Sequence, residues 1–222
     1  MTLKTILALS TGTLAMLILI TILMKRYSIA CWKGIPVSIL LTVTGTIGTY
    51  IWFFVEGSWF GGRSYYGAVF LVPIAFAYLA RYINIPYSEL MDFCAPAECI
   101  MLVIMKYQCL IDGCCGGRTL GVTADGVGII FPSQIVELSN ALILAAVLMC
   151  MAFSSRNRGK IYAWYMILYG ATRFVLNWFR EDTTPLLMAL PAGNLWSLLA
   201  VFIGTLWLLD YKIAIVKNEK NQ

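Results

Sequence analysis

Arg173 is the residue in this sequence whose surroundings point most directly to chemistry, because it interrupts an otherwise apolar segment. Tyr169 lies four residues before it, and Asn177 and Arg180 lie four and seven residues after it. On a helix these spacings place all four side chains on one face. Two guanidinium groups on one face suit a phosphate, because each can donate two parallel N–H bonds to its oxygens.

The composition indicates what surrounds this polar face. The chain has 222 residues, of which 60% are hydrophobic and 12% charged, and its mean hydropathy is +0.81. Soluble domains carry about 25% charged residues, so this chain has too few to cover the surface of a soluble fold. We therefore expect an integral membrane protein, folded as a single membrane domain over residues 1–222.

In such a protein the position of Arg173 is costly. An arginine in the membrane interior costs roughly 2.5–3.5 kcal/mol even on a lenient insertion scale, and intramembrane charges are therefore usually functional. We expect Arg173 to contact a ligand; the alternative is a structural ion pair with Glu137 or Asp92. Histidine is absent, so proton transfer would fall to carboxylate, thiolate, tyrosine, lysine or arginine groups.

Seven segments are long and apolar enough to cross a membrane, which takes about 20 residues. The first is expected to be a retained helix rather than a cleaved signal, because its positive charges follow the apolar run. The predicted fold is therefore all-α, with about seven transmembrane helices at Thr5–Met24, Pro36–Phe54, Tyr66–Tyr82, Glu89–Met105, Ser133–Phe153, Ile161–Phe179 and Ala192–Tyr211.

The distribution of lysine and arginine predicts the orientation. With the N-terminus outside and the C-terminus in the cytoplasm, ten of the 16 basic residues lie on inner segments and six on outer ones. Outer-face loops are then expected near residues 55–65, 106–132 and 180–191. The residues that suggest chemistry thus share one side of the membrane.

Acidic and amide side chains open the predicted fifth span. Gln134 and Glu137 are three residues apart and share a helix face. Glu137 is expected either to neutralise Arg173 or Arg118, or to act as a base. A third possibility is a dipole role in the first turn of the helix.

The predicted fourth span contains two further acids, Asp92 and Glu98. They indicate that this helix faces protein or water rather than lipid. Two roles are open for them: a proton path, or ion pairs with Arg63 and Lys106.

The stretch Met105–Phe131 is the longest interruption in the apolar pattern and contains Cys109, Cys114 and Cys115. Their spacings of five and one do not match the C-x2-C pairs typical of zinc sites, and histidine is absent, so no metal site is expected. Packed thiols are the favoured interpretation. A disulfide is possible if the compartment is oxidising.

A glycine-rich segment, Gly61–Gly67, precedes the predicted third span and contains Arg63, Tyr65 and Tyr66. Glycines before a helix can expose backbone N–H groups to an anion. This segment is expected to contribute to an anion site.

Taken in order, these motifs resemble the prolipoprotein diacylglyceryl transferase family. The resemblance covers most of Ser64–Gly204. Its motifs are S-Y-Y-G-A (Ser64–Ala68), D-x-x-A-P-A (Asp92–Ala97), K-Y-Q-C-L-I-D-G-C-C-G-G-R (Lys106–Arg118), P-S-Q-I-V-E (Pro132–Glu137), Y-G-A-T-R-F-V-L-N-W-F-R (Tyr169–Arg180) and G-N-L-W-S-L (Gly193–Leu198).

The resemblance implies a multi-pass protein of the bacterial cytoplasmic (inner) membrane. It implies transfer of a diacylglyceryl group from phosphatidylglycerol to the lipobox cysteine of a prolipoprotein signal peptide, with release of glycerol phosphate. The partners would be these two substrates and membrane lipid, with no nucleic acid and no cofactor. The alternatives are a related transferase with another acceptor, or a non-catalytic protein that binds or transports lipid.

The resemblance also suggests roles for single residues. Arg173 matches the family's essential arginine, and Tyr66 stands where the family has histidine. The expected catalytic residues are Arg173, Tyr66 and Glu137, with Tyr66 or Glu137 as proton acceptor. The expected substrate-binding residues are Arg118, Arg180, Lys106, Gln134, Tyr169, Gly117 and Asp112.

Overall fold

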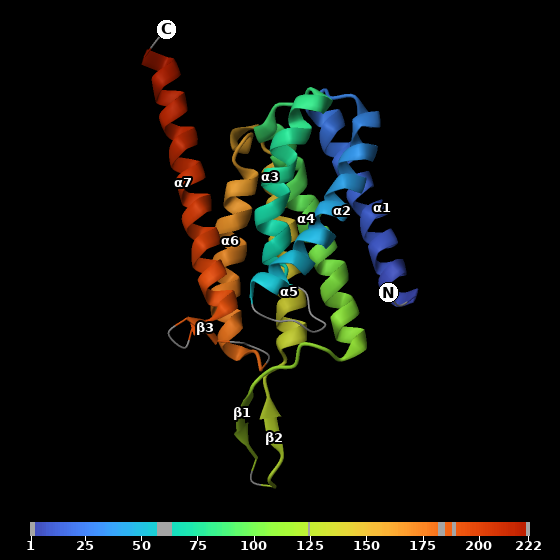
Figure 1. The fold of residues 1–222 in the computed structure, drawn as a ribbon, viewed down its shortest axis with the longest axis vertical. Coiled ribbons are helices and arrows are strands. Elements are labelled where there is room, and N and C mark those ends of the chain that lie inside the picture. Colours follow the sequence, from blue (N-terminus) through green and yellow to red (C-terminus); the bar gives the residue numbers. More distant parts are fainter. Residues whose placement is uncertain (1–2, 57–63, 124, 182–184, 188–189, 221–222) are drawn as a thin grey trace.

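A computed structural model describes residues 3–56, 64–123, 125–181, 185–187 and 190–220. Arg63 and the glycines Gly61 and Gly62, which we expected to help bind an anion, lie outside these residues. The described chain forms seven α-helices in an elongated bundle (Figure 1). Their bounds are α1 Leu3–Arg26, α2 Gly34–Val55, α3 Tyr66–Ile83, α4 Tyr87–Asp112, α5 Ser133–Ala152, α6 Ile161–Leu176 and α7 Ala192–Lys220.

Short elements connect the helices. Two antiparallel pairs of strands lie at the end of the bundle where α1 begins (Figure 1). The hairpin β1–β2 projects beyond the helices, with Gly121 opposite Ile129 and Val122 opposite Gly128. The short elements are η1 Cys31–Lys33, η2 Ser155–Asn157, η3 Asn177–Phe179, β1 Thr119–Val122, β2 Gly128–Ile130, β3 Pro185–Leu187 and β4 Leu190–Pro191.

The helices confirm the predicted membrane architecture. Six of them, α1 to α5 and α7, are long and apolar enough to cross a membrane. The remaining helix, α6, has 16 residues and continues into η3. At 1.5 Å per residue it spans about 24 Å, close to the ~30 Å of a bilayer core. The chain is therefore a multi-pass, all-α membrane protein.

The two ends of the bundle differ in content. The start of α1, the hairpin β1–β2 and the β3–β4 pair share one end, and the C-terminus lies at the other (Figure 1). This arrangement agrees with the expectation that the central stretch and residues 180–191 lie on one side. We refer to this end as the hairpin end. That it faces outward stays a prediction.

Helix α4 differs from the prediction. We expected it to end at Met105, but it runs to Asp112, so Lys106, Cys109 and Asp112 are helical. The loop expected near 106–132 therefore begins at Gly113. The helix ends there because Gly113 adopts a left-handed conformation, with φ of 65°, which glycine adopts at little cost. A change to polar residues along a helix predicts where the helix leaves the lipid, but the helix itself can continue beyond that point.

Helices α2 and α3 pack backbone against backbone at a pair of glycines. A Cβ added to Gly48 would lie 2.6 Å from the carbonyl oxygen of Gly67, and a Cβ on Gly67 would collide with the carbonyl of Gly48. Small residues allow such close approach between membrane helices, where van der Waals packing is a main source of association. This contact fixes the start of α3, and with it Tyr65 and Tyr66.

We predict that Gly67→Ala destabilises the protein by about 1–3 kcal/mol, because the methyl group would force α2 and α3 apart. The midpoint of thermal unfolding in detergent measures this loss. Gly45→Ala is the matched control, since its Cβ would meet only Ala68 Cβ at 3.7 Å, an ordinary contact. Equal midpoints for the two variants would contradict the packing argument.

Candidate functional site

Glu137 receives three positively charged side chains at the hairpin end of the bundle. It lies in the first turns of α5 and is 4% exposed. Its Oε1 atom accepts hydrogen bonds from Nη1 of Arg173 at 2.5 Å and from Nη1 of Arg180 at 2.8 Å. Its Oε2 atom accepts a hydrogen bond from Nζ of Lys106. We call these four residues the Glu137 cluster.

Three segments of the chain bring the cations to α5. Lys106 comes from the hairpin end of α4, Arg173 from the last turn of α6, and Arg180 from the residue after η3. The predicted shared face of Arg173 and Arg180 agrees with this geometry, since both bind one oxygen. The alternative interpretation of Arg173, an ion pair with Glu137, is also observed. A guanidinium has five N–H groups, so Arg173 can bind Glu137 and a second anion together.

Tyrosines border the cluster on its inner side. The ring of Tyr169, one turn before Arg173, lies 5.3 Å from the Tyr65 ring and 5.5 Å from the Tyr66 ring between centroids. Tyr66, the expected proton acceptor, is buried, and its hydroxyl is 2.5 Å from Oγ of Ser197 on α7. Tyr66 therefore lies beside the cluster with its hydroxyl paired to another hydroxyl.

Glu56, the residue after α2, is a site residue that sequence reasoning missed. Its carboxylate accepts a hydrogen bond from Ser64 Oγ at 2.6 Å. Burial raises the pKa of Glu56 above its ordinary value of 4.5, and the Ser64 bond and the positive charge of Arg173 offset part of that rise. An acid after an apolar span is common, so the sequence carried no signal for this role.

Two buried amide side chains next to the cluster have polar atoms without a hydrogen-bond partner among the described residues. Asn177, 3% exposed, follows Arg173 by one turn, and Asn194, fully buried, lies in the first turn of α7. The Asn177 amide lies against Gly193, where a Cβ would be 2.5 Å from its Nδ2. Within the described part of the chain, Nδ2 of Asn177 and both amide atoms of Asn194 have no partner. Buried polar groups of this kind usually meet a ligand or water.

The acids of α4 have partners other than the predicted ones. Asp92 accepts N–H groups of Gly159 at 2.5 Å and Ile161 at 2.9 Å, so it caps the start of α6. Of the two roles left open for Asp92 and Glu98, an ion pair with Lys106 is not formed, because Lys106 lies further along α4 and binds Glu137. The other expected partner, Arg63, lies outside the described residues. The proton path stays a prediction.

Glu98 lies between the two ends of the bundle. Its carboxylate accepts hydrogen bonds from the hydroxyls of Tyr162 and Tyr165, each at 3.1 Å. These tyrosines are three residues apart and share one face of α6. The three side chains therefore link α4 to α6 inside the bundle.

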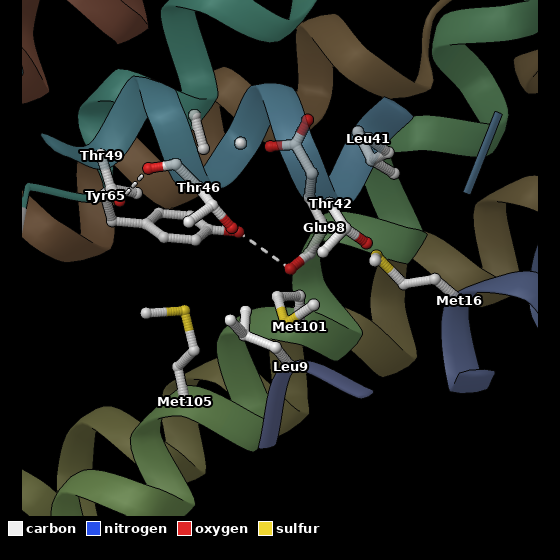
Figure 2. Close-up of a pocket in the computed structure, with 12 residues that line it drawn as sticks. Leu9, Met16, Leu41, Thr42, Thr46, Thr49, Tyr65, Glu98, Met101 and Met105 are labelled. Carbon is white, nitrogen blue, oxygen red and sulfur yellow. Dashed lines mark hydrogen bonds between the residues drawn. The ribbon is translucent and has the colours of Figure 1, made fainter. Parts of the chain in front are cut away.

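An apolar pocket opens between α1, α2, α3 and α4 (Figure 2). Tyr65 crosses it, and its hydroxyl donates a hydrogen bond to the backbone oxygen of Glu98 at 2.8 Å. Its lining residue Met105 is next to Lys106 in the sequence, and the Tyr65 ring lies 5.3 Å from the ring of Tyr169, one turn before Arg173. Other lining residues are Leu9, Met16, Leu41, Thr46 and Met101.

The other predicted binding residues are spread around the hairpin end. Asp112 pairs with Lys4 at 3.1 Å, and the Gln134 side chain donates to the carbonyl oxygen of Cys114 at 2.5 Å. Arg118 is exposed, and its backbone N–H bonds to the carbonyl of Phe179 at 2.8 Å. The structure thus places these three side chains outside the contacts of Glu137.

Gly117 has a backbone role in the site. It forms a β-bridge with Arg180, and a Cβ at this position would collide with the carbonyl oxygen of Phe131. Only glycine therefore lets the segment after α4 run beside Arg180.

We predict that Glu137→Gln costs about 3–5 kcal/mol of unfolding free energy, because removing one partner of a buried ion pair leaves the others uncompensated. Denaturant titration in detergent measures the change. The matched control is Asp112→Asn, whose partner Lys4 is largely exposed and whose ion pair is worth about 0–1 kcal/mol. A Glu137→Gln protein as stable as this control would show that the cluster is not held by the carboxylate.

Comparison with known proteins identifies the family of this chain. A model of the family described as prolipoprotein diacylglyceryl transferase matches residues 7–209. A phosphatidylglycerol–prolipoprotein diacylglyceryl transferase of Francisella tularensis subsp. tularensis (strain FSC 198) is 29% identical over 175 residues, which cover 72% of this chain and 64% of the relative. One of the same name from Geobacter sulfurreducens is 33% identical over 138 residues, which cover 58% and 52%. The match spans less than two thirds of the length of either relative. Because the family model covers nearly the whole chain, the chain belongs to the prolipoprotein diacylglyceryl transferase family.

Proposed function

We propose that this protein transfers a diacylglyceryl group from phosphatidylglycerol to the lipobox cysteine of a prolipoprotein. The cysteine sulfur forms a thioether bond to the glyceryl carbon, the bond from that carbon to the phosphate oxygen breaks, and glycerol phosphate leaves. The names of the relatives state both substrates. The observation that carries the proposal is the convergence of Lys106, Arg173 and Arg180 on Glu137.

The Glu137 cluster would bind the phosphate. The leaving glycerol phosphate gains negative charge as its bond to carbon breaks, so cations fixed beside it stabilise the transition state more than the bound lipid. Arg173 is the expected phosphate contact, with Arg180 and Lys106 assisting. Glu137 holds the three cations in place before the lipid arrives. This role uses both of its oxygens, which makes Glu137 a positioning residue rather than a base.

Glu56 is the proton acceptor that the structure supports best. The acceptor thiol must lose its proton to become a nucleophile. A general base works best when its pKa lies close to the ambient pH, and burial shifts Glu56 in that direction. The positive charge of Arg173 lowers the pKa of Glu56, which supports a position close to the expected phosphate contact. Tyr66 would then position neighbours through its bond with Ser197 rather than take the proton itself.

The glycerol headgroup and the acyl chains of the lipid would contact residues near the Glu137 cluster. Among the described residues, Asn177 Nδ2 has no partner and can donate to a hydroxyl of the glycerol headgroup, and the Asn194 amide, both of whose polar atoms lack a partner, can donate to one and accept from one. An acyl chain would contact the apolar pocket between α1 and α4, which is lined by aliphatic and methionine side chains as far as Met105 and which would have to widen to admit it. One lipid would thereby contact the cluster with its phosphate and the pocket with a tail.

The proposed transfer implies where the protein is located in the cell. We place the protein in the bacterial inner membrane as one membrane domain, with the hairpin end outward, where prolipoprotein signal peptides emerge. The prevalence of basic residues at the opposite end supports this orientation.

We predict that Arg173→Ala lowers transfer by about 100-fold or more, the usual effect of removing one preorganised donor. The assay uses purified protein, phosphatidylglycerol with a labelled diacylglyceryl group and a lipobox peptide. Arg158→Ala is the control, because its guanidinium bonds Glu89 at the other end of the bundle. Label on the peptide cysteine in the wild type and the control, lost in Arg173→Ala, supports the proposal. Label on another acceptor, or lipid binding without transfer, contradicts it.

We also predict a pH dependence. As a base, Glu56 acts in its ionised form, so transfer falls as the pH drops through a pKa that lies above the ordinary 4.5. Glu56→Gln should lower the rate and remove this acidic limb from the pH–rate profile. An unchanged profile in the variant would remove Glu56 from the mechanism.

A further inference from the structure

Three cysteine sulfurs meet at the hairpin end of α4. Cys109 lies in the last turn of the helix, and Cys114 and Cys115 lie just after it. Their Sγ atoms all lie within 4.8 Å of one another, and those of Cys114 and Cys115 are 3.8 Å apart. This cluster lies outside the contacts of Glu137 and has no part in the proposed transfer.

The backbone folds back to bring the sulfurs together. Gly113 ends α4 in a left-handed conformation, and the N–H of Cys114 bonds to the carbonyl of Cys109 at 3.2 Å. Cys115 also has a positive φ, 62°, which is rare for a residue other than glycine. The turn thus brings side chains five and six residues apart into contact, although the sequence contains no C-x2-C pair.

Helix α5 holds this turn from outside. Ser133 Oγ donates a hydrogen bond to the carbonyl oxygen of Cys115 at 2.8 Å, and Gln134 Nε2 donates one to that of Cys114 at 2.5 Å. Two neighbouring residues at the start of α5 therefore fix the two peptides that carry the sulfurs. Ligand groups held by such outer contacts need little rearrangement when a metal binds.

We propose that Cys109, Cys114 and Cys115 bind one thiophilic d10 cation, Zn²⁺ or Cu⁺. Thiolate ligands favour these two ions. With Zn–S bonds of about 2.3 Å, the sulfurs of a tetrahedral site lie about 3.8 Å apart, as the Cys114 and Cys115 sulfurs already do. Cys109 needs to move by at most about 1 Å to complete the set of three thiolates, well within the reach of a rotamer change, and a water molecule would be the fourth ligand of Zn²⁺.

Charge and access also suit a cation. Binding releases the three thiol protons and leaves three thiolates around the ion. Cys114 is exposed and Cys109 and Cys115 are partly exposed, so an ion can enter from the aqueous side. The expectation of no metal rested on the cysteine spacings and the absence of histidine, and the proximity of the three sulfurs argues against it.

The test is metal content of the full-length protein in detergent, prepared with a reductant that does not bind metals. Samples are loaded with Zn²⁺ or with Cu⁺ and desalted, with Ca²⁺ as a non-thiophilic comparison. We expect one Zn²⁺ or Cu⁺ per chain, and a thiolate-to-metal charge-transfer absorption with Co²⁺. The triple variant Cys109→Ser, Cys114→Ser, Cys115→Ser should lose both signals.

The matched control is the double variant Cys31→Ser, Cys150→Ser, which removes two exposed cysteines elsewhere and should retain the ion. Equal metal content in the wild type and the triple variant would overturn the proposal. So would a disulfide among the three cysteines, found by peptide mapping of protein isolated without reductant, because a disulfide joins sulfurs at about 2.05 Å and removes two ligands.

Discussion

The structure depends on one buried carboxylate that holds three cations at one end of a helical bundle. Lys106, Arg173 and Arg180 reach Glu137 from α4, α6 and the end of η3. Each charge alone would be costly next to lipid, and Glu137 makes all three tolerable by pairing with them. The same contact fixes the relative positions of the segments that line the site. The ion pairs with Glu137 therefore both hold the fold together and position the expected binding residues.

Helices α4 and α6 are connected by polar contacts along their length. At one end Asp92 caps the start of α6, and near the middle Glu98 binds two of its tyrosines. At the hairpin end Lys106 and Arg173 meet on Glu137. The proposed transfer uses only the contacts at the hairpin end. The contacts of Asp92 and Glu98 fix α4 against α6, so that Lys106 and Arg173 lie at the same height in the bundle.

The sequence predicted the spans because about 20 apolar residues in a row leave few alternatives. It also predicted the face that carries Arg173 and Arg180, since helical spacing is local. The extent of α4 was missed, because its last two turns are polar and a left-handed Gly113 ends them. Glu56 was missed because its burial depends on neighbours distant in sequence. The backbone N–H groups that Asp92 accepts were not foreseen for the same reason.

The proximity of the three cysteine sulfurs likewise depends on the backbone conformation of the turn that follows α4. Motif spacing assumes regular backbone, and here two residues with positive φ, Gly113 and Cys115, bring the thiols together. Local pattern thus predicted the helices and the cationic face. The contacts between segments far apart in sequence required the three-dimensional structure.

The central claim is that the Glu137 cluster recognises the phosphate of a lipid. Native mass spectrometry of the purified protein with equimolar phosphatidylglycerol and diacylglycerol, which lacks the phosphate, tests it most directly. We predict a preference for phosphatidylglycerol that Arg173→Ala abolishes and that Arg158→Ala leaves intact. Equal binding of the two lipids by the wild type, or an undiminished preference in Arg173→Ala, would contradict it.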